Sequence, residues 1–157
     1  MQEIERKFLL KNDSFKKEAY NSYSIKQAYL NSHKERTTRI RIRGEEAFIT
    51  VKGKSSKSGL SRFEWEKNIS IAEAEELLQL CEPGRIEKTR FLVKVDHHIF
   101  EVDEFYKENE GLIIAEVELS SENEKVKLPN WIAEEVTGDK KYYNSYLIQN
   151  PYKNWKK

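Results

Sequence analysis

The chain has 157 residues and a mass of 18.7 kDa, a length typical of one domain with a sizeable core. Its 28 basic and 27 acidic residues leave a net charge of +1, which excludes broad, salt-driven adhesion to nucleic acids or membranes. The single cysteine excludes an internal disulfide and is typical of a reducing compartment. The sequence shows neither a signal peptide nor an apolar run long enough to cross a bilayer, so we expect a cytoplasmic protein.

The first segment, residues 3–8, alternates charged and apolar side chains as a β-strand does. Glu3, Glu5 and Lys7 share one face, and Ile4 and Phe8 share the other. Carboxylates on alternate residues beside an ammonium group suit a divalent cation and a phosphate. A strand with one face in water explains the same pattern, and this stretch alone favours that simpler interpretation.

The same alternation returns along the chain, and about eight strands are expected in total. Their residue ranges are 3–8, 24–31, 37–44, 47–52, 61–68, 86–95, 99–105 and 113–119. Helical segments are expected within 13–23, after a capping box formed by Ser70 and Glu73, from Pro129 onward, and at 144–149.

Three local motifs are set aside as sites. Gly53-Lys54-Ser55 ends like a phosphate-binding P-loop, but Phe48 stands where that motif needs a glycine. Cys81 has helical spacing and is expected in the core rather than as a nucleophile. His97 and His98 lie in a hairpin turn and are expected to be solvated, because the sequence offers no cysteine or third histidine at zinc spacing.

Strands with one apolar and one charged face can be assembled in two ways. In a sandwich or a helix-backed sheet the charged faces meet water, whereas in a closed barrel they can line a tunnel. The charges here sort by strand, which indicates a binding site because burying many charges is costly unless they are paired or bound to a ligand. The acidic pairs are Glu3/Glu5, Glu64/Glu66, Glu101/Asp103 and Glu116/Glu118, and the basic pairs are Arg39/Arg41 and Lys88/Arg90.

The two kinds of strand together suit one kind of chemistry. Arginine presents a planar fork that matches phosphate oxygens two at a time, and lysine supplies a point charge. Rows of acidic oxygens suit Mg²⁺ or Mn²⁺ together with phosphate and water. The pattern therefore indicates a metal-assisted reaction on a linear chain of phosphates.

Taken in order, these motifs resemble the CYTH domain family, the triphosphate tunnel metalloenzymes. The similarity starts at the E-x-E-x-K motif of residues 3–7, ends at Val136-Thr137-Gly138-Asp139 and covers nearly the whole chain. The resemblance implies a mainly β, α+β fold: an eight-stranded antiparallel closed barrel with a charged interior and helices packed outside. It also implies a single domain over residues 1–150, followed by a polar tail at 151–157.

The resemblance further implies a role for each set of charged residues. One metal would bind the phosphate chain, and a second would activate the water that attacks the terminal phosphorus. Glu64 and Glu66 would orient the basic side chains or contact metal. The residues implied to bind phosphate are Lys7, Arg39, Arg41, Lys52, Lys88 and Arg90, and those implied to hold Mg²⁺ or Mn²⁺ are Glu3, Glu5, Glu116 and Glu118, with Asp103 assisting.

Some small bacterial members of the family have a tyrosine at the position of Tyr29, and these members tend to be inorganic tripolyphosphatases. In them, the tyrosine is thought to work with a lysine such as Lys88. The plainer alternative for Tyr29 is a half-buried strand tyrosine.

We expect hydrolysis of inorganic tripolyphosphate, a small-molecule partner, to pyrophosphate and phosphate. A class IV adenylate cyclase that converts ATP to cAMP, a thiamine triphosphatase and a non-catalytic polyphosphate or nucleotide sensor are the alternatives. No nucleic acid or membrane partner is expected, and a homodimer is compatible with the family.

Overall fold

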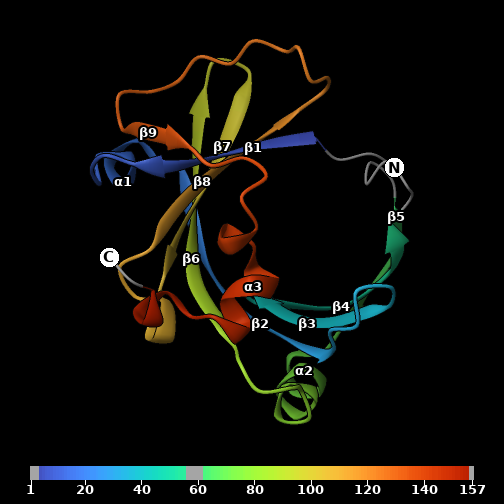
Figure 1. Ribbon diagram of the computed structural model, residues 1–157. Helices are drawn as coiled ribbons and strands as arrows, with labels where there is room; N and C mark the ends of the chain where they lie inside the picture. The colour runs from blue at the N-terminus through green and yellow to red at the C-terminus, as the bar shows by residue number, and fades with distance from the viewer. Residues whose placement is uncertain (1–3, 56–61, 156–157) are drawn as a thin grey trace. The chain divides into compact units, whose positions relative to one another are not determined.

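The computed structural model describes residues 4–55 and 62–155, so Glu3 lies outside the described residues (Figure 1). The described residues form two compact units, each of which is considered by itself. Unit 1 contains residues 24–87, and unit 2 contains residues 4–23 and 88–155. Within these ranges no helix has both the length and the apolar character needed to span a membrane.

Unit 1 is an antiparallel sheet with one covering helix. Its strand order is β5-β4-β3-β2, formed by β2 (Asn21–Asn31, in this unit from Ser24), β3 (Thr37–Arg43), β4 (Glu46–Ser55) and β5 (Arg62–Ile69). Helix α2 (Ile71–Gln79) begins at the predicted capping box, in which the Glu73 N–H donates to Ser70 Oγ and the Ser70 N–H donates to Glu73 Oε1. Its apolar face buries Ala74 and Leu78 against Ile40 and other apolar residues of β2, β3 and β4.

Cys81 follows α2 and packs, partly buried, at the margin of this core. Burial raises the pKa of its thiol above the ordinary value, which disfavours the reactive thiolate. The expected packing of Cys81 against the core is confirmed, and its lack of a nucleophilic role stays a prediction.

Unit 2 is an antiparallel sheet with the order β6-β7-β8-β1-β9. Its strands are β1 (Ile4–Leu10), β6 (Ile86–Val95, in this unit from Lys88), β7 (His98–Phe105), β8 (Ile113–Leu119) and β9 (Ile132–Glu135). The apolar face packs on α1 (Phe15–Glu18) and on Trp131, whose ring meets Phe15 and Phe100 edge to face at centroid distances of 5.9 and 5.7 Å. Because apolar side chains cover that face, the charged side chains that alternate with them along the strands, such as Lys7, Asp103 and Glu116, lie on the opposite one.

Short helical segments complete unit 2: η1 (Lys107–Asn109), η2 (Lys140–Tyr142), α3 (Asn144–Gln149) and η3 (Tyr152–Asn154). The predicted helical turn at residues 144–149 is thus confirmed as α3. Trp155 packs against this segment, since its ring lies 5.1 Å from Tyr152 and 5.4 Å from Tyr142, centroid to centroid.

The predicted α+β, mainly β, antiparallel fold is confirmed, but two predicted details are wrong. The described residues contain nine strands instead of eight, and their sheet is open, with β5 and β9 at its ends, not closed as predicted for a barrel. The expected helix after Pro129 is instead strand β9. Its Ile132 pairs with Leu10, and the Lys11 N–H donates to the Trp131 carbonyl, so pairing with the edge of β1 outweighs the local helix signal.

Candidate functional site

The charged face of unit 2 is assembled by strand register. Side chains directly opposite each other in an antiparallel pair point to the same face. The register of β6, β7, β8 and β1 therefore gathers charges from four strands on one face. The charged cross-strand partners are Glu5 and Glu118, Lys7 and Glu116, Glu101 and Glu116, and Arg90 and Asp103.

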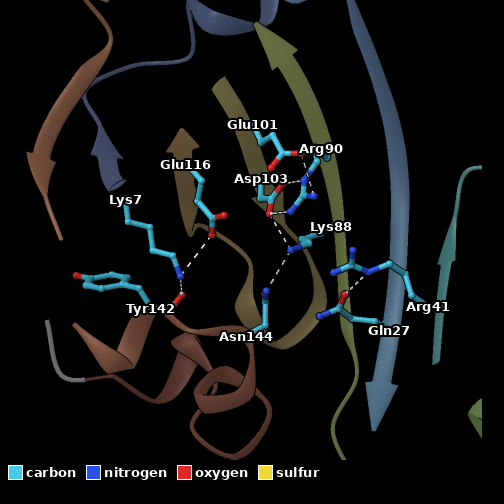
Figure 2. Close-up of polar contacts among 10 residues, drawn as sticks. All are labelled: Lys7, Gln27, Arg41, Lys88, Arg90, Glu101, Asp103, Glu116, Tyr142 and Asn144. Carbon is cyan, nitrogen blue, oxygen red and sulfur yellow. Dashed lines mark hydrogen bonds and ion pairs between the residues drawn. The ribbon is translucent and has the colours of Figure 1, made fainter. Parts of the chain in front are cut away.

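A buried ion cluster lies at the centre of this face (Figure 2). Asp103 accepts Lys88 Nζ at 2.7 Å and the Arg90 guanidinium at 2.8 and 3.0 Å, and Lys88 and Asp103 are only 1% and 4% exposed. Burial works against both charges, but the two cations lower the pKa of Asp103, and Asp103 raises that of Arg90. Asp103 and Arg90 are therefore ionised at neutral pH.

Lys7 is a second buried cation, 7% exposed. Its Nζ lies 3.4 Å from Glu116 Oε1 and donates to the Tyr142 carbonyl at 3.5 Å, while the Tyr143 ring lies 4.5 Å from it (Figure 2). The C-terminal segment of unit 2 thus fixes this lysine on the charged face, and it does the same for Lys88, whose Nζ lies 3.4 Å from Asn144 Oδ1.

Two pairs of carboxylates stand directly opposite each other on this face. Glu101 of β7 faces Glu116 of β8, and Glu5 of β1 faces Glu118 of β8. Like charges in this position repel each other, and burial, together with the nearby carboxylates Asp103 and Glu116, raises the pKa of Glu101. Carboxylate oxygens are the ligands that Mg²⁺ and Mn²⁺ prefer, so these residue types suit a divalent cation. Among the described residues, the group with three ligand atoms within 4.8 Å of one another lies elsewhere, at His97, His98 and Glu124.

The charged face of unit 1 is more open to solvent. Arg39 Nη2 donates to Thr50 Oγ1 at 3.3 Å, and that hydroxyl donates to Glu66 Oε2 at 2.7 Å. Lys52 Nζ and Glu64 lie 3.6 Å apart, with 31% and 52% of their side chains exposed. Glu64 and Glu66 therefore contact basic side chains of β3 and β4 in this structure, an arrangement that suits an orienting role.

Gln27 and Arg41 are opposite each other on β2 and β3. Arg41 Nε donates to Gln27 Oε1 at 2.7 Å, and because a guanidinium can only donate, this contact fixes which end of the amide is the oxygen (Figure 2). Gln27 is fully buried, and its Nε2 has no hydrogen-bond partner within the described residues; the same holds for the buried Arg39 Nε. Each of these two buried N–H donors, Gln27 Nε2 and Arg39 Nε, lowers the stability of the fold because its hydrogen bond is not made.

The predicted site residues thus fall into two groups, one in each unit. Tyr29 lies partly buried on β2 opposite Arg39, and its expected partnership with Lys88 stays a prediction. Sequence reasoning named Glu101 with Asp103 among the acidic pairs but gave it no role, and it missed Gln27 and Asn144 as site members. Both of these side chains are neutral and carried no charge signal.

Comparison with known proteins gives consistent matches over the whole chain. The CYTH domain matches residues 1–145. A protein of Acetivibrio thermocellus named inorganic triphosphatase is 46% identical over 155 residues, covering 98% of this chain and 97% of that protein. A protein of Nitrosomonas europaea with the same name is 38% identical over 151 residues, covering 94% and 97%. The crystal structure of an inorganic triphosphatase matches with a TM-score of 0.71 and 34% identity, covering 94% of this chain and 95% of that one.

Proposed function

The chain belongs to the CYTH domain family, and we propose that it is a divalent-metal-dependent hydrolase that converts inorganic tripolyphosphate to pyrophosphate and phosphate. Two relatives named inorganic triphosphatase, matched over at least 94% of this chain, support the reaction. The observation that carries the proposal is the charged face of unit 2, where opposed carboxylates stand beside buried, preorganised cations.

We assign phosphate binding to the basic side chains of the charged face of each unit, each unit being considered by itself. The guanidinium groups of Arg39 and Arg41 offer forked donors to phosphate oxygens, and Lys52 adds a point charge. In unit 2, Lys7, Lys88 and Arg90 offer fixed positive charge where negative charge develops during transfer of the phosphoryl group. Because these three are held by Glu116 and Asp103, they need little rearrangement when substrate binds.

The carboxylates that would hold Mg²⁺ or Mn²⁺ are Glu5, Glu101, Glu116 and Glu118, with Glu3 as the member predicted from the sequence alone. When bound, the cation would neutralise phosphate charge and lower the pKa of a coordinated water. Asp103 has both oxygens engaged by Lys88 and Arg90, so we assign it the positioning of those two cations in place of direct metal binding. Tyr29 remains a proposed partner in catalysis, to be tested by Tyr29→Phe.

Replacing one exposed carboxylate tests the metal assignment without disturbing the core. Glu118→Ala removes a ligand from an exposed position, so the fold survives while metal-dependent release of phosphate from tripolyphosphate falls by at least ~100-fold. Glu122→Ala, an equally exposed glutamate in the following loop, is the matched control and keeps full activity. A near-normal kcat for Glu118→Ala at saturating metal would overturn the assignment of this ligand.

The alternatives give different products under the same conditions. Conversion of ATP to cAMP without triphosphate hydrolysis would identify a cyclase, and release of phosphate from thiamine triphosphate alone would identify an organic triphosphatase. Tight binding of tripolyphosphate without turnover under any divalent metal would identify a sensor. The cytoplasmic location and the absence of nucleic acid and membrane partners stay expectations from composition.

A further inference from the structure

A cluster of two histidines and a glutamate lies away from the charged face, at the turn between β6 and β7. His97, His98 and Glu124 each offer one ligand atom, and these atoms lie within 4.8 Å of one another. His98 is buried at 6% exposure, whereas the side chain of His97 is 77% exposed. None of the three residues takes part in the proposed triphosphate chemistry.

The turn explains how two consecutive side chains reach the same carboxylate. Consecutive residues of a regular strand point to opposite faces. Asp96 adopts a positive φ of 56° in the turn, and the two imidazole rings stack with centroids 4.0 Å apart. As a result, Nε2 of both histidines points at one oxygen, Glu124 Oε2, at 3.7 Å for His97 and in direct hydrogen bond for His98.

Glu124 is held in place by a contact outside the cluster. Its Oε1 accepts the Ser120 N–H at 2.7 Å, which leaves Oε2 for the histidines. A ligand carboxylate oriented by a second hydrogen bond is a recurrent feature of metal sites.

We propose that His97, His98 and Glu124 bind a Zn²⁺ ion that ties the loop between β8 and β9 to the hairpin of β6 and β7. A set of two imidazole nitrogens and one carboxylate oxygen binds Zn²⁺ in preference to Mg²⁺. Because the His97 side chain is exposed, water can occupy the fourth coordination position. This site is separate from the carboxylates of the charged face and independent of the proposed activity.

The test is a Zn²⁺ titration of the untagged, EDTA-treated full chain against a chromophoric chelator, with excess Mg²⁺ present to occupy carboxylate sites. One Zn²⁺ per chain is expected, and His97→Ala, His98→Ala and Glu124→Gln each weaken binding at least ~10-fold. His33→Ala is the matched control, because His33 is the remaining histidine of the sequence, and it binds Zn²⁺ like the unmodified chain.

His97→Ala keeps the test decisive even where a variant of buried His98 fails to fold, since the His97 side chain is largely exposed. Co²⁺ provides a second readout: the visible absorption of a low-coordinate nitrogen and oxygen site should appear with the unmodified chain and be lost in His97→Ala. Zn²⁺ binding that is absent, or equally tight in His97→Ala, overturns the proposal. Hydrolysis of tripolyphosphate with Mg²⁺ is unchanged in His97→Ala.

A second inference comes from the buried amide of unit 1 and rests on the proposed function. We infer that Gln27 Nε2 donates a hydrogen bond to a phosphate oxygen of the substrate beside Arg41. The amide is fully buried, its orientation is fixed by Arg41, and its donor has no partner within the described part of the chain. A bound phosphate would supply the missing acceptor.

Gln27→Leu separates this role from a structural one. If the amide binds substrate, KM for tripolyphosphate rises about 5- to 20-fold with little change in kcat. Stability changes little, because the loss of the oxygen that accepts Arg41 Nε offsets the removal of a buried unmade donor. Gln79→Leu, an exposed glutamine on α2, is the control. An unchanged KM contradicts the inference. If the chain hydrolyses nothing, calorimetric binding of tripolyphosphate in EDTA still tests it, because Gln27→Leu should weaken that binding by a similar factor.

Discussion

The two charged faces of this molecule are built from the same kinds of residue but differ in how tightly the charges are held. In unit 2, Lys88 and Asp103 are buried, the Arg90 side chain is only 11% exposed, and the three are joined at 2.7 to 3.0 Å. In unit 1, Arg39 and Lys52 lie 3.8 and 3.6 Å from carboxylates whose side chains are 44% and 52% exposed. The difference implies that unit 2 depends on its charges for stability, whereas unit 1 keeps its cations available to a ligand.

The largest expected effect is the loss of the anion from the buried cluster. Asp103→Asn leaves Lys88 and Arg90 buried without their shared partner, so the free energy of unfolding falls by about 3–5 kcal/mol. Glu66→Gln, which removes an exposed partner in unit 1, costs less than about 1 kcal/mol. Chemical denaturation of both variants measures the contrast, and similar losses would contradict it.

The same cluster predicts how stability depends on pH. Because the folded pKa of Asp103 is depressed, its contribution is complete above the ordinary carboxyl pKa of about 3.9 and is lost as the pH falls through the folded value. The difference in unfolding free energy between the unmodified chain and Asp103→Asn should therefore shrink on acidification. Denaturation over a pH series in EDTA checks this, and a constant difference would contradict it.

Removing the repulsion between Glu101 and Glu116 should have a smaller effect on stability but a large effect on activity. Glu101→Gln removes the repulsion with Glu116 at the cost of one partly exposed contact to Arg90. Unfolding free energy without metal should change by less than about 1 kcal/mol, while the metal concentration for half-maximal activity rises about 10- to 100-fold. Unchanged metal dependence would show that Glu101 holds no cation.

In unit 1 the expected effect is on substrate binding. Arg41→Lys keeps the charge but loses the planar fork and the contact to Gln27, so KM for tripolyphosphate rises about tenfold with stability nearly unchanged. Steady-state kinetics and thermal denaturation together test this. A loss of stability matching that of Asp103→Asn would erase the distinction between the two faces.

The smallest expected effect lies away from both faces. Ser70→Ala removes the capping box of α2 and costs about 1 kcal/mol of unfolding free energy. Because α2 covers the apolar side of the sheet, KM and kcat should not change, which calorimetric melting and kinetics on the same sample can verify. A raised KM would mean that the sheet transmits the loss of packing to Arg39 and Arg41.

Sequence patterns predicted the elements that depend on local chemistry. Alternation located the strand from Thr37 to Arg43, and the capping box located the start of α2. Strand β9 was missed because its pairing with β1 depends on a partner more than 120 residues away. Site prediction followed the same rule: charged residues were found by alternation, whereas the buried amide of Gln27 became visible only through strand register and its unpaired donor.

The central claim, metal-dependent hydrolysis of inorganic triphosphate, is tested most directly by comparing substrates. Phosphate release from tripolyphosphate, ATP and thiamine triphosphate is measured in parallel with Mg²⁺, with Mn²⁺ and then with EDTA. We expect fast hydrolysis of tripolyphosphate to equal amounts of pyrophosphate and phosphate, abolished by EDTA, with little reaction of ATP or thiamine triphosphate. Hydrolysis that persists in EDTA, or no hydrolysis of tripolyphosphate with either metal, would contradict it.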